Sequence, residues 1–452
     1  MKRFFAFLII IAALFAANAQ TYTLDSCINL ALRNNIELKN AGLDIEASQE
    51  VKKQAFSKYF PKINAFAGGY YAINPLISYS IDDIENAEAR QMLHNLYFEY
   101  GRPLGIPDQL SLCENGISMG AAAIQPLYAG GRIVNGNKLA DLGIRAAELQ
   151  QDLTFDKILQ DVERNFWLVY SLQQKKITLD KAKTTLDTLY KDVSTAKAAG
   201  LATRNDELKV IIKQNEIKSN LLKVHNGILL AKQALCQSIG IEYDENIVFN
   251  DTLDLEKITK SLDYVDFEKA TAHRKETMLL NLNVEAENLK KKMIVGEALP
   301  QVMVGVAASY GNPVFDKYSA NGLAFATLNI PITDWNETSH KIKQQNLIIQ
   351  KAENTRTDLT QKMKLELQQA WNDVEEAKSQ LDLSKQMLIE TEENLSTSII
   401  NYQSGLTTIS EVLEAQTLNL QSSNQLTDSL IDLKMKVRRY NILTKSRSLI
   451  YH

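Results

Sequence analysis

Side chains that could do covalent or metal chemistry are few in this chain and lie far apart. Cysteine occurs only as Cys27, Cys113 and Cys236, too few and too scattered for a disulfide framework or a zinc site. The five histidines are isolated, and none has a metal-ligand spacing. The sequence contains no nucleophile elbow, P-loop or dinucleotide fingerprint. It therefore predicts no catalytic residue, no cofactor and no metal site, and it argues against an enzyme.

One glycine-rich turn precedes a helical pattern, at Ala129-Gly130-Gly131-Arg132. The backbone N–H groups of such a turn can bind a phosphate. The second half of the chain has Asp334-Trp335-Asn336 at the equivalent position, so a plain strand-to-helix corner is the favoured interpretation. Pairs of acidic residues are frequent, but they fall on polar helix faces, where solvation explains them.

The two halves of the chain repeat one pattern at an offset of 205 residues. Pro126 pairs in this way with Pro331, and Gly200 pairs with Gly405. A helical pattern of the same length, without a gap, lies between Pro126 and Gly200 and again between Pro331 and Gly405. A duplication this long predicts that each half has the order helix, strand, loop, strand, long helix, turn, helix.

The positions of proline indicate where the helices run. All eight prolines fall within residues 61–126 and 300–331, and their absence elsewhere permits very long helices. Apolar residues in steps of seven from Leu367 to Tyr402 predict a coiled-coil-like helix over residues 334–404, about 105 Å long. Shorter helices are expected at 25–59, 206–240, 264–298 and 410–446. If two short helices stack end to end beside a long one, Cys27 and Cys236 become neighbours; whether they pair stays open.

Four segments have the length and composition of strands: 62–72, 116–125, 301–311 and 321–330. Each has about the ten residues that a tilted strand needs to cross a bilayer. Aromatic residues mark three of the four helix–strand corners, as in an interfacial girdle: Tyr59-Phe60, Tyr128 and Trp335. Four strands cannot close a barrel, and lipid does not tolerate an open sheet edge, so a membrane-spanning chain of this kind must oligomerise.

The N-terminus reads as a secretory signal over residues 1–19. Lys2 and Arg3 precede an apolar core, and Ala17-Asn18-Ala19 forms a small-residue cleavage site. No cysteine follows the cleavage site, so no lipid anchor is expected there. The mildly acidic formal charge of −4 gives no reason to expect nucleic acid. The predicted organisation is a first repeat at 20–240, a linker at 241–263, a second repeat at 264–447 and a tail at 448–452.

Several motifs together resemble the TolC-type outer membrane efflux proteins over essentially the whole mature length. These motifs are Leu32-Arg33-Asn34-Asn35, Pro61-Lys62-Ile63, the segment from Gln125 to Arg132, and Tyr402-Gln403-Ser404-Gly405-Leu406-Thr407-Thr408 followed by Val412-Leu413-Glu414-Ala415-Gln416. The resemblance implies a mainly α protein with membrane β-strands. Its duplicated helix-strand-strand-helix-helix halves would form a homotrimer, with a twelve-stranded β-barrel in the outer membrane continuous with a long α-helical periplasmic tunnel.

The resemblance also implies a function and partners. The chain would be a passive exit channel that takes its cargo from an inner-membrane pump of the RND or ABC type through a periplasmic membrane-fusion adaptor. The two Gly-Leu turns would form the periplasmic tip and the adaptor docking surface, through Gly200, Leu201, Thr203, Gly405, Leu406 and Thr408. Candidate acids for a gate in the lumen are Asp187, Asp192, Asp382, Glu390, Glu392 and Glu393. One or two of these six are expected to line the constriction.

The first loop, residues 74–115, is much longer than the second, residues 312–320. Its amphipathic stretch, which includes Ile81, Met92 and Leu96, predicts a short helix over the external mouth or a variable surface loop. The alternative to a channel is a secreted helical scaffold or adaptor-like protein without a pore. Membrane-length strands and a full duplication favour the channel. The sequence does not name the cargo.

Overall fold

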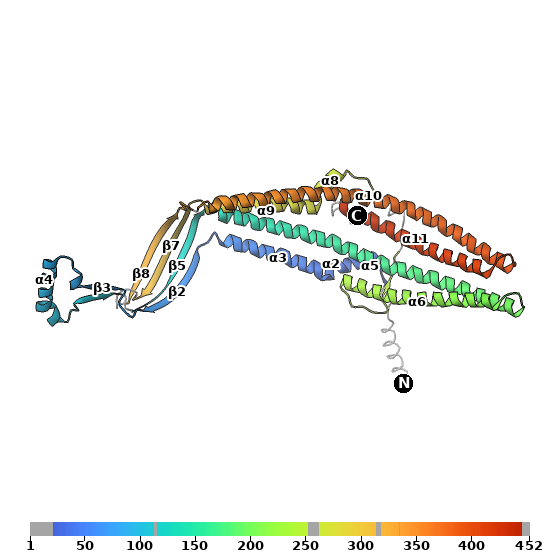
Figure 1. Cartoon of the computed structure of the whole chain (residues 1–452), viewed down its shortest axis with the longest axis horizontal. Helices are drawn as coiled ribbons and strands as arrows, with labels where there is room; N and C mark the ends of the chain where they lie inside the picture. The colour runs from blue at the N-terminus through green and yellow to red at the C-terminus, as the bar shows by residue number, and fades with distance from the viewer. Residues whose placement is uncertain (1–20, 113–114, 252–261, 313–317, 334, 445–452) are drawn as a thin grey trace, which may run out of the picture. The chain divides into compact units, whose positions relative to one another are not determined.

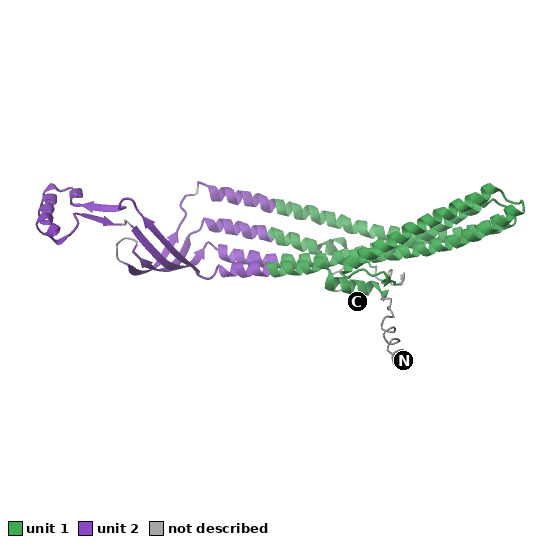
Figure 2. Cartoon of the chain, turned by 90° about the horizontal axis from the view of Figure 1, so that it is seen from below, with its two compact units in different colours: residues 1–47, 144–284, 351–452 green, residues 48–143, 285–350 purple. Residues whose placement is uncertain are grey.

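The computed structural model describes residues 21–112, 115–251, 262–312, 318–333 and 335–444. These form two compact units, coloured differently in Figure 2: residues 1–47, 144–284 and 351–452 in the first (green), and 48–143 and 285–350 in the second (purple). Each unit draws on both halves of the sequence. The predicted signal peptide, the C-terminal tail, Cys113 and Asp334 lie outside the described residues.

The long helices confirm the duplication residue by residue. Helices α5 (Arg132–Ala198) and α10 (Glu337–Gln403) both have 67 residues, and their bounds differ by the expected offset. The helices that follow them, α6 (Arg204–Ile239) and α11 (Ile409–Thr444), both have 36 residues and the same offset. A tight turn follows each long helix and leads into its shorter, antiparallel partner, so that each half ends in a helical hairpin (Figure 1).

The first short helix is broken, and the prediction of one helix over 25–59 was wrong. Helix α2 spans Leu24–Asn34 and α3 spans Ile36–Ser57. Between them Asn35 is extended, and its Oδ1 accepts hydrogen bonds from the N–H groups of Glu37 at 2.9 Å and Leu38 at 3.3 Å. Asn35 Nδ2 also donates to the carbonyl of Ser238, at 2.9 Å. Asn35 therefore caps α3 with its own side chain, and a further hydrogen bond joins the break to a residue about 200 positions away.

The corresponding helix of the second half is broken as well, which corrects the prediction of one helix over 264–298. Helix α8 spans Phe267–Ala272 and α9 spans Lys275–Glu297. Thr277 Oγ1 donates to the carbonyl of Thr271 across the break, at 2.7 Å. The buried Arg274 in the break pairs with Glu276 and Glu366.

The second unit contains a four-stranded antiparallel sheet in the order β2-β5-β7-β8. Its strands are β2 (Lys62–Tyr71), β5 (Asn115–Ala129), β7 (Gln301–Gly311) and β8 (Ser319–Asn329). All four predicted strands are present, and β5 runs further than expected, through a register shift between Pro126 and Tyr128. Among the described residues, β2 and β8 each pair with one neighbour only, which leaves two open sheet edges.

The register of the sheet places residues of like polarity on the same face. Residues opposite one another in an antiparallel pair share a face, and Val306 stands opposite both Ala123 of β5 and Ala324 of β8. This face is mainly apolar in every strand, although Gln125 stands on it opposite Val304, and it includes Ile63, Ala65, Ala67, Met119, Ala121, Val302, Ala308, Tyr310, Ala326 and Leu328. The opposite face is mixed and includes Lys62, Asn64, Phe66, Ser118, Ile124, Gln301, Ser309, Asn321, Leu323, Phe325 and Thr327.

The two strand-to-helix corners have the same backbone conformation. Gly130 and Gly131 are left-handed, with φ of 62° and 75°, and so are Trp335 and Asn336, with φ of 48° and 64°. A Cβ added to Gly130 would lie 2.1 Å from the carbonyl oxygen of Gly296, so a close backbone contact excludes a side chain there. The interpretation of this glycine-rich turn as a structural corner is confirmed.

The long loop after β2 has secondary structure of its own. It contains a hairpin of β3 (Ile77–Ser80) and β4 (Gln109–Leu112), with helix α4 (Ala87–Leu96) between them. The expected short helix is thus present. Its position over an external mouth stays a prediction.

The core of the first unit contains both described cysteines. Cys27 of α2 and Cys236 of α6 belong to one buried cluster with Val162, Phe166 and Trp167 of α5. Both cysteines are free thiols, and burial raises the pKa of Cys27 to about 12. The short parallel pair of β1 (Thr21–Tyr22) and β6 (Val248–Phe249) lies at this cluster. In the part of the chain that the structure describes, no helix is both long and apolar enough to cross a membrane.

Candidate functional site at the helical turns

The turn of the first hairpin is built by one glycine and one capping box. Gly200 is left-handed, with φ of 79°, and the Leu201 N–H donates back to the carbonyl of Ala196 at 2.8 Å, which ends α5. Thr203 caps α6: the Asp206 N–H donates to Thr203 Oγ1 at 3.2 Å, and the Thr203 N–H donates to Asp206 Oδ2 at 3.0 Å. Leu201 is left 85% exposed at the end of the turn.

The turn of the second hairpin repeats this construction. Gly405 has a φ of 74°, and the Leu406 N–H donates to the carbonyl of Asn401 at 2.8 Å. Thr408 accepts from the Glu411 N–H at 3.4 Å and donates to Glu411 Oε1 at 3.2 Å. Leu406 is 78% exposed. The predicted glycine turns and threonine caps are therefore present in both halves, and each turn exposes one leucine.

Apolar and polar contacts join the two hairpins near their turns. Ile409 and Val412 of α11 are buried in one cluster with Val193 of α5 and Val210 of α6. Lys209 Nζ of α6 donates to Ser410 Oγ of α11 at 2.8 Å. The two hairpins of one chain are consequently packed against each other near their turns.

An ion cluster inside the first turn was not anticipated from the sequence. The Glu207 carboxylate is buried and pairs with Lys197 at 2.6 Å and with Arg204. Hydrogen bonds from Lys197 and Arg204 hold the pKa of Glu207 below its usual range. The signal for this cluster in the sequence is the presence of basic residues, Lys197 and Arg204, on either side of the turn. The second half has Tyr402 and Ile409 at the equivalent positions.

Tyr402 is the aromatic counterpart of this cluster. It lies at the end of α10, packs against the same apolar cluster, and is close to Asp206 and Asp192. Burial and these two carboxylates raise the pKa of the Tyr402 hydroxyl. The candidate gate residue Asp192 of α5 and the cap residue Asp206 of α6 thus both act on the Tyr402 hydroxyl.

The other candidate gate residues fall into different surroundings. Asp187 accepts a hydrogen bond from Gln214 Nε2 of α6 at 2.8 Å, so it joins the two helices of the first hairpin. Asp382 is exposed and pairs with Lys385 at 3.2 Å. Glu390 accepts from Gln386 on its own helix, and Glu392 and Glu393 are exposed.

Helix geometry separates the four acids of α10. Asp382 and Glu393 are eleven residues apart, about three turns, and so lie on nearly the same line along the helix. Glu390 and Glu392 are two residues apart and point to nearly opposite sides. Only a subset of these acids can therefore face one axis; which of them line a constriction stays a prediction.

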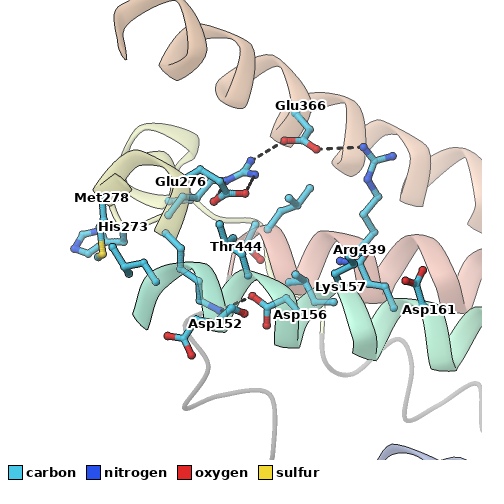
Figure 3. A pocket seen from close by; sticks show the side chains of 18 of the residues that line it. Asp152, Asp156, Lys157, Asp161, His273, Glu276, Met278, Glu366, Arg439 and Thr444 are labelled. Atoms are coloured by element: carbon cyan, nitrogen blue, oxygen red, sulfur yellow. Dashed lines mark hydrogen bonds and ion pairs between the residues drawn. The ribbon is translucent and has the colours of Figure 1, made fainter. Parts of the chain in front are cut away.

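A charged cavity of about 470 Å³ lies within the first unit, beside the break between α8 and α9 (Figure 3). Arg274 donates to Glu276 at 2.6 Å and to Glu366 of α10 at 2.8 Å, and Arg439 of α11 pairs with Glu366 at 3.3 Å. Lys275 pairs with Asp156 of α5. Each of these basic side chains has an acidic partner. The cavity is therefore lined by the ion-pair network that stabilises the break between α8 and α9.

The described residues contain no group of three or more His, Cys, Asp or Glu that could hold a metal ion. The described residues instead form paired long helices with exposed turns in one unit and a four-stranded sheet in the other.

Residues 296–435 match a family model described as outer membrane efflux protein, whereas no curated protein sequence matches the chain. Among solved structures, CusC is similar with a TM-score of 0.76 at 15% identity, covering 94% of this chain and 92% of CusC. VceC from Vibrio cholerae is similar with a TM-score of 0.73 at 15% identity, covering 94% of this chain and 96% of VceC.

The open state of the Neisseria gonorrhoeae MtrE outer membrane channel is similar with a TM-score of 0.71 at 14% identity, covering 93% of this chain and 88% of MtrE. At these identities the structural likeness establishes the fold. Residues 296–435 thus match the outer membrane efflux protein family, and nearly the whole chain has the fold of the outer-membrane channels to which it is similar.

Proposed function

We propose that the chain is the exit duct of a tripartite efflux system. An inner-membrane pump of the RND or ABC type would supply the cargo and the energy, and a periplasmic adaptor would join the pump to the duct. The observation that supports this proposal most is the apolar face that the register aligns across all four strands. A sheet with one mainly apolar face and one mixed face suits a wall between lipid and water.

The open edges of the sheet call for further copies of the chain. Unpaired backbone groups at the edges of β2 and β8 are not tolerated in lipid. Pairing β2 of one copy with β8 of the next closes a barrel of eight strands from two copies, or of twelve from three. Eight strands leave an interior filled by side chains, whereas twelve leave a lumen, so transport favours a homotrimer.

Exposed aromatic residues support a membrane position for the sheet. Tyr59, Phe60, Tyr128 and Trp335 stand at the ends of strands or in the corners next to them, and all four are exposed. Such residues gather at the boundary between lipid and water, where an apolar ring and a polar edge are both satisfied. Outer-membrane lipid is thus the proposed surrounding of the apolar face.

The helical turns are the proposed adaptor docking surface. Gly200, Thr203, Gly405 and Thr408 fix the two turns, and Leu201 and Leu406 offer exposed apolar contacts. A gate at the same end would use acids that three copies bring around one axis. Asp382 and Glu393 are the proposed pair, because they share a line on α10, and crowded carboxylates there would favour cations over anions.

The proposal is tested by labelling two neighbouring alanines of β7. Ala307 lies on the mixed face and Ala308 on the apolar face, so Ala307→Cys and Ala308→Cys are matched variants, made in a Cys113→Ser chain. In proteoliposomes, a membrane-impermeant maleimide should react with the cysteine at position 307 and spare the one at 308. Equal labelling at both positions would favour the helical scaffold without a pore.

A further inference from the structure

Two phenylalanine rings on the mixed face of the sheet each lie over a glycine of the neighbouring strand. Phe66 of β2 stands opposite Gly120 of β5, and Phe325 of β8 stands opposite Gly305 of β7. A Cβ added to Gly120 would lie 2.8 Å from Phe66 Cζ, and one added to Gly305 would lie 2.7 Å from Phe325 Cε1. Each ring therefore occupies space that a side chain on the opposite strand would need.

The two pairs occupy equivalent places in the two halves of the chain, with the partners exchanged. Strands β2 and β7 begin 239 residues apart, at residues 62 and 301, and this offset takes Phe66 to Gly305. The offset of 205 that relates β5 to β8 takes Gly120 to Phe325. Each half thus keeps one ring and one glycine at the same place in its strand pair, although the ring has changed strands.

The rings keep accessible surface in uncharged surroundings. Phe66 is 47% exposed and Phe325 is half-buried. Both line shallow hollows of the sheet, and the hollow at Phe66 also includes Ser309 and Asn321. Lys62 is the one charged residue on the mixed face of the four described strands. The rings are therefore the parts of this face best suited to hold an apolar group.

The stagger of the strands brings the two rings to one level of a closed barrel. Gly120 stands opposite Ser309, four residues from Gly305, so the second strand pair is displaced along the first. Strands displaced in this way are tilted when the sheet closes, and equivalent positions of successive strand pairs then lie at the same height. Three copies of the chain would carry six phenylalanine rings at that height.

We propose that these rings form a belt in the lumen that binds flat aromatic cations on their way through the duct. This inference rests on the proposed function, because the mixed face lines a lumen only if copies of the sheet close a barrel. The face of an aromatic ring carries partial negative charge and attracts cations, and a flat apolar group can stack on it. The charge preference agrees with that of the proposed gate acids, Asp382 and Glu393.

Ethidium, a flat aromatic cation, serves as the probe. Its fluorescence anisotropy reports binding to the full chain in lipid nanodiscs, with empty nanodiscs as the blank. Phe66→Leu/Phe325→Leu removes both rings but keeps apolar side chains, and it should weaken ethidium binding about tenfold, with about threefold from each single change. Phe66→Tyr/Phe325→Tyr keeps both rings and should bind ethidium as the unaltered chain does.

Two controls separate the belt from other binding sites. Tyr310 is 53% exposed and lies on the apolar face, so Tyr310→Leu removes a ring from the opposite side of the sheet and should leave ethidium binding unchanged. On the unaltered chain, 1-methylquinolinium should displace ethidium, whereas tetraethylammonium, which has no flat ring, should not. The displacement experiment decides the matter even if the double leucine variant fails to assemble.

The possible results separate the inference from the proposed function. An unaltered chain that forms no trimer in nanodiscs would remove the barrel, and the proposed function with it. A trimer that binds ethidium equally well after both rings are lost would overturn the inference and leave the proposed function standing. Leucine variants that lower only the temperature of trimer dissociation would show that the rings merely cover the glycines. Equal displacement by both competitors would assign ethidium binding to carboxylates and overturn the inference as well.

Discussion

Gly130 and Trp335 take the same left-handed backbone conformation at equivalent places in the two halves of the chain, with φ of 62° and 48°. Glycine adopts this conformation freely, whereas a tryptophan pays about 1–2 kcal/mol for it. Only Gly130 has a neighbouring backbone, that of Gly296, in the space of a side chain. The Trp335 ring is 92% exposed, so this residue, whose backbone is strained, exposes its aromatic ring at the corner between strand and helix.

Substituting Gly130 should therefore destabilise the second unit. Gly130→Ala places a Cβ 2.1 Å from the Gly296 carbonyl oxygen, and the free energy of unfolding should fall by about 2 kcal/mol or more. Gly143→Ala is the control, because this glycine lies inside α5 with open space around it and should be neutral or slightly stabilising. Denaturant unfolding in detergent gives both values, and equal effects would contradict the steric account of the corner.

The threonine cap of the first turn should be measurable locally. Thr203→Ala removes the acceptor for the Asp206 N–H, and the first turn of α6 should lose about 1 kcal/mol. Thr203→Ser keeps the oxygen and should preserve most of that stability. Hydrogen exchange of amides in the first turn of α6 reports the difference. Unchanged protection in the alanine variant would show that tertiary packing alone holds this end of the helix.

The turns should also weaken in acid. Hydrogen bonds from Thr203 lower the pKa of Asp206, and those from Thr407 and Thr408 lower the pKa of Glu411. A pKa that is lower in the folded chain means that the carboxylate stabilises the fold fully above the unfolded value, about 4. That contribution disappears as the pH falls through the folded value. Amide protection at the turns should thus decline below about pH 4, and Asp206→Asn should flatten the decline at the first turn.

Acids on a common line of α10 should act alike on conduction. Asp382→Asn and Glu393→Gln should each reduce cation preference in planar bilayers, since the two positions lie on one side of the helix. Glu390→Gln and Glu392→Gln cannot both do so, because these side chains point to nearly opposite sides. Four equal effects, or none, would remove Asp382 and Glu393 as the proposed gate pair.

The sequence predicts the repeated parts of this fold well, since prolines, glycine turns and heptad spacing act locally. The bounds of α5 and α10 differ by the offset already visible in Pro126 and Pro331. The break at Asn35 has a local cap in the Asn34-Asn35 pair that the prediction overlooked, since Asn35 accepts from Glu37 and Leu38. The break at Arg274 escaped prediction because one of its ion-pair partners, Glu366, lies far along the chain. The ion cluster at Glu207 escaped for a similar reason: burial of that carboxylate depends on how the turn packs.

The most direct test of the account is the native mass of the detergent-extracted protein from the outer-membrane fraction. The open edges of β2 and β8 and the lumen that transport requires predict a particle of three chains. A monomer or dimer released in soluble form from the periplasm would contradict the exit duct and leave a helical scaffold as the better account.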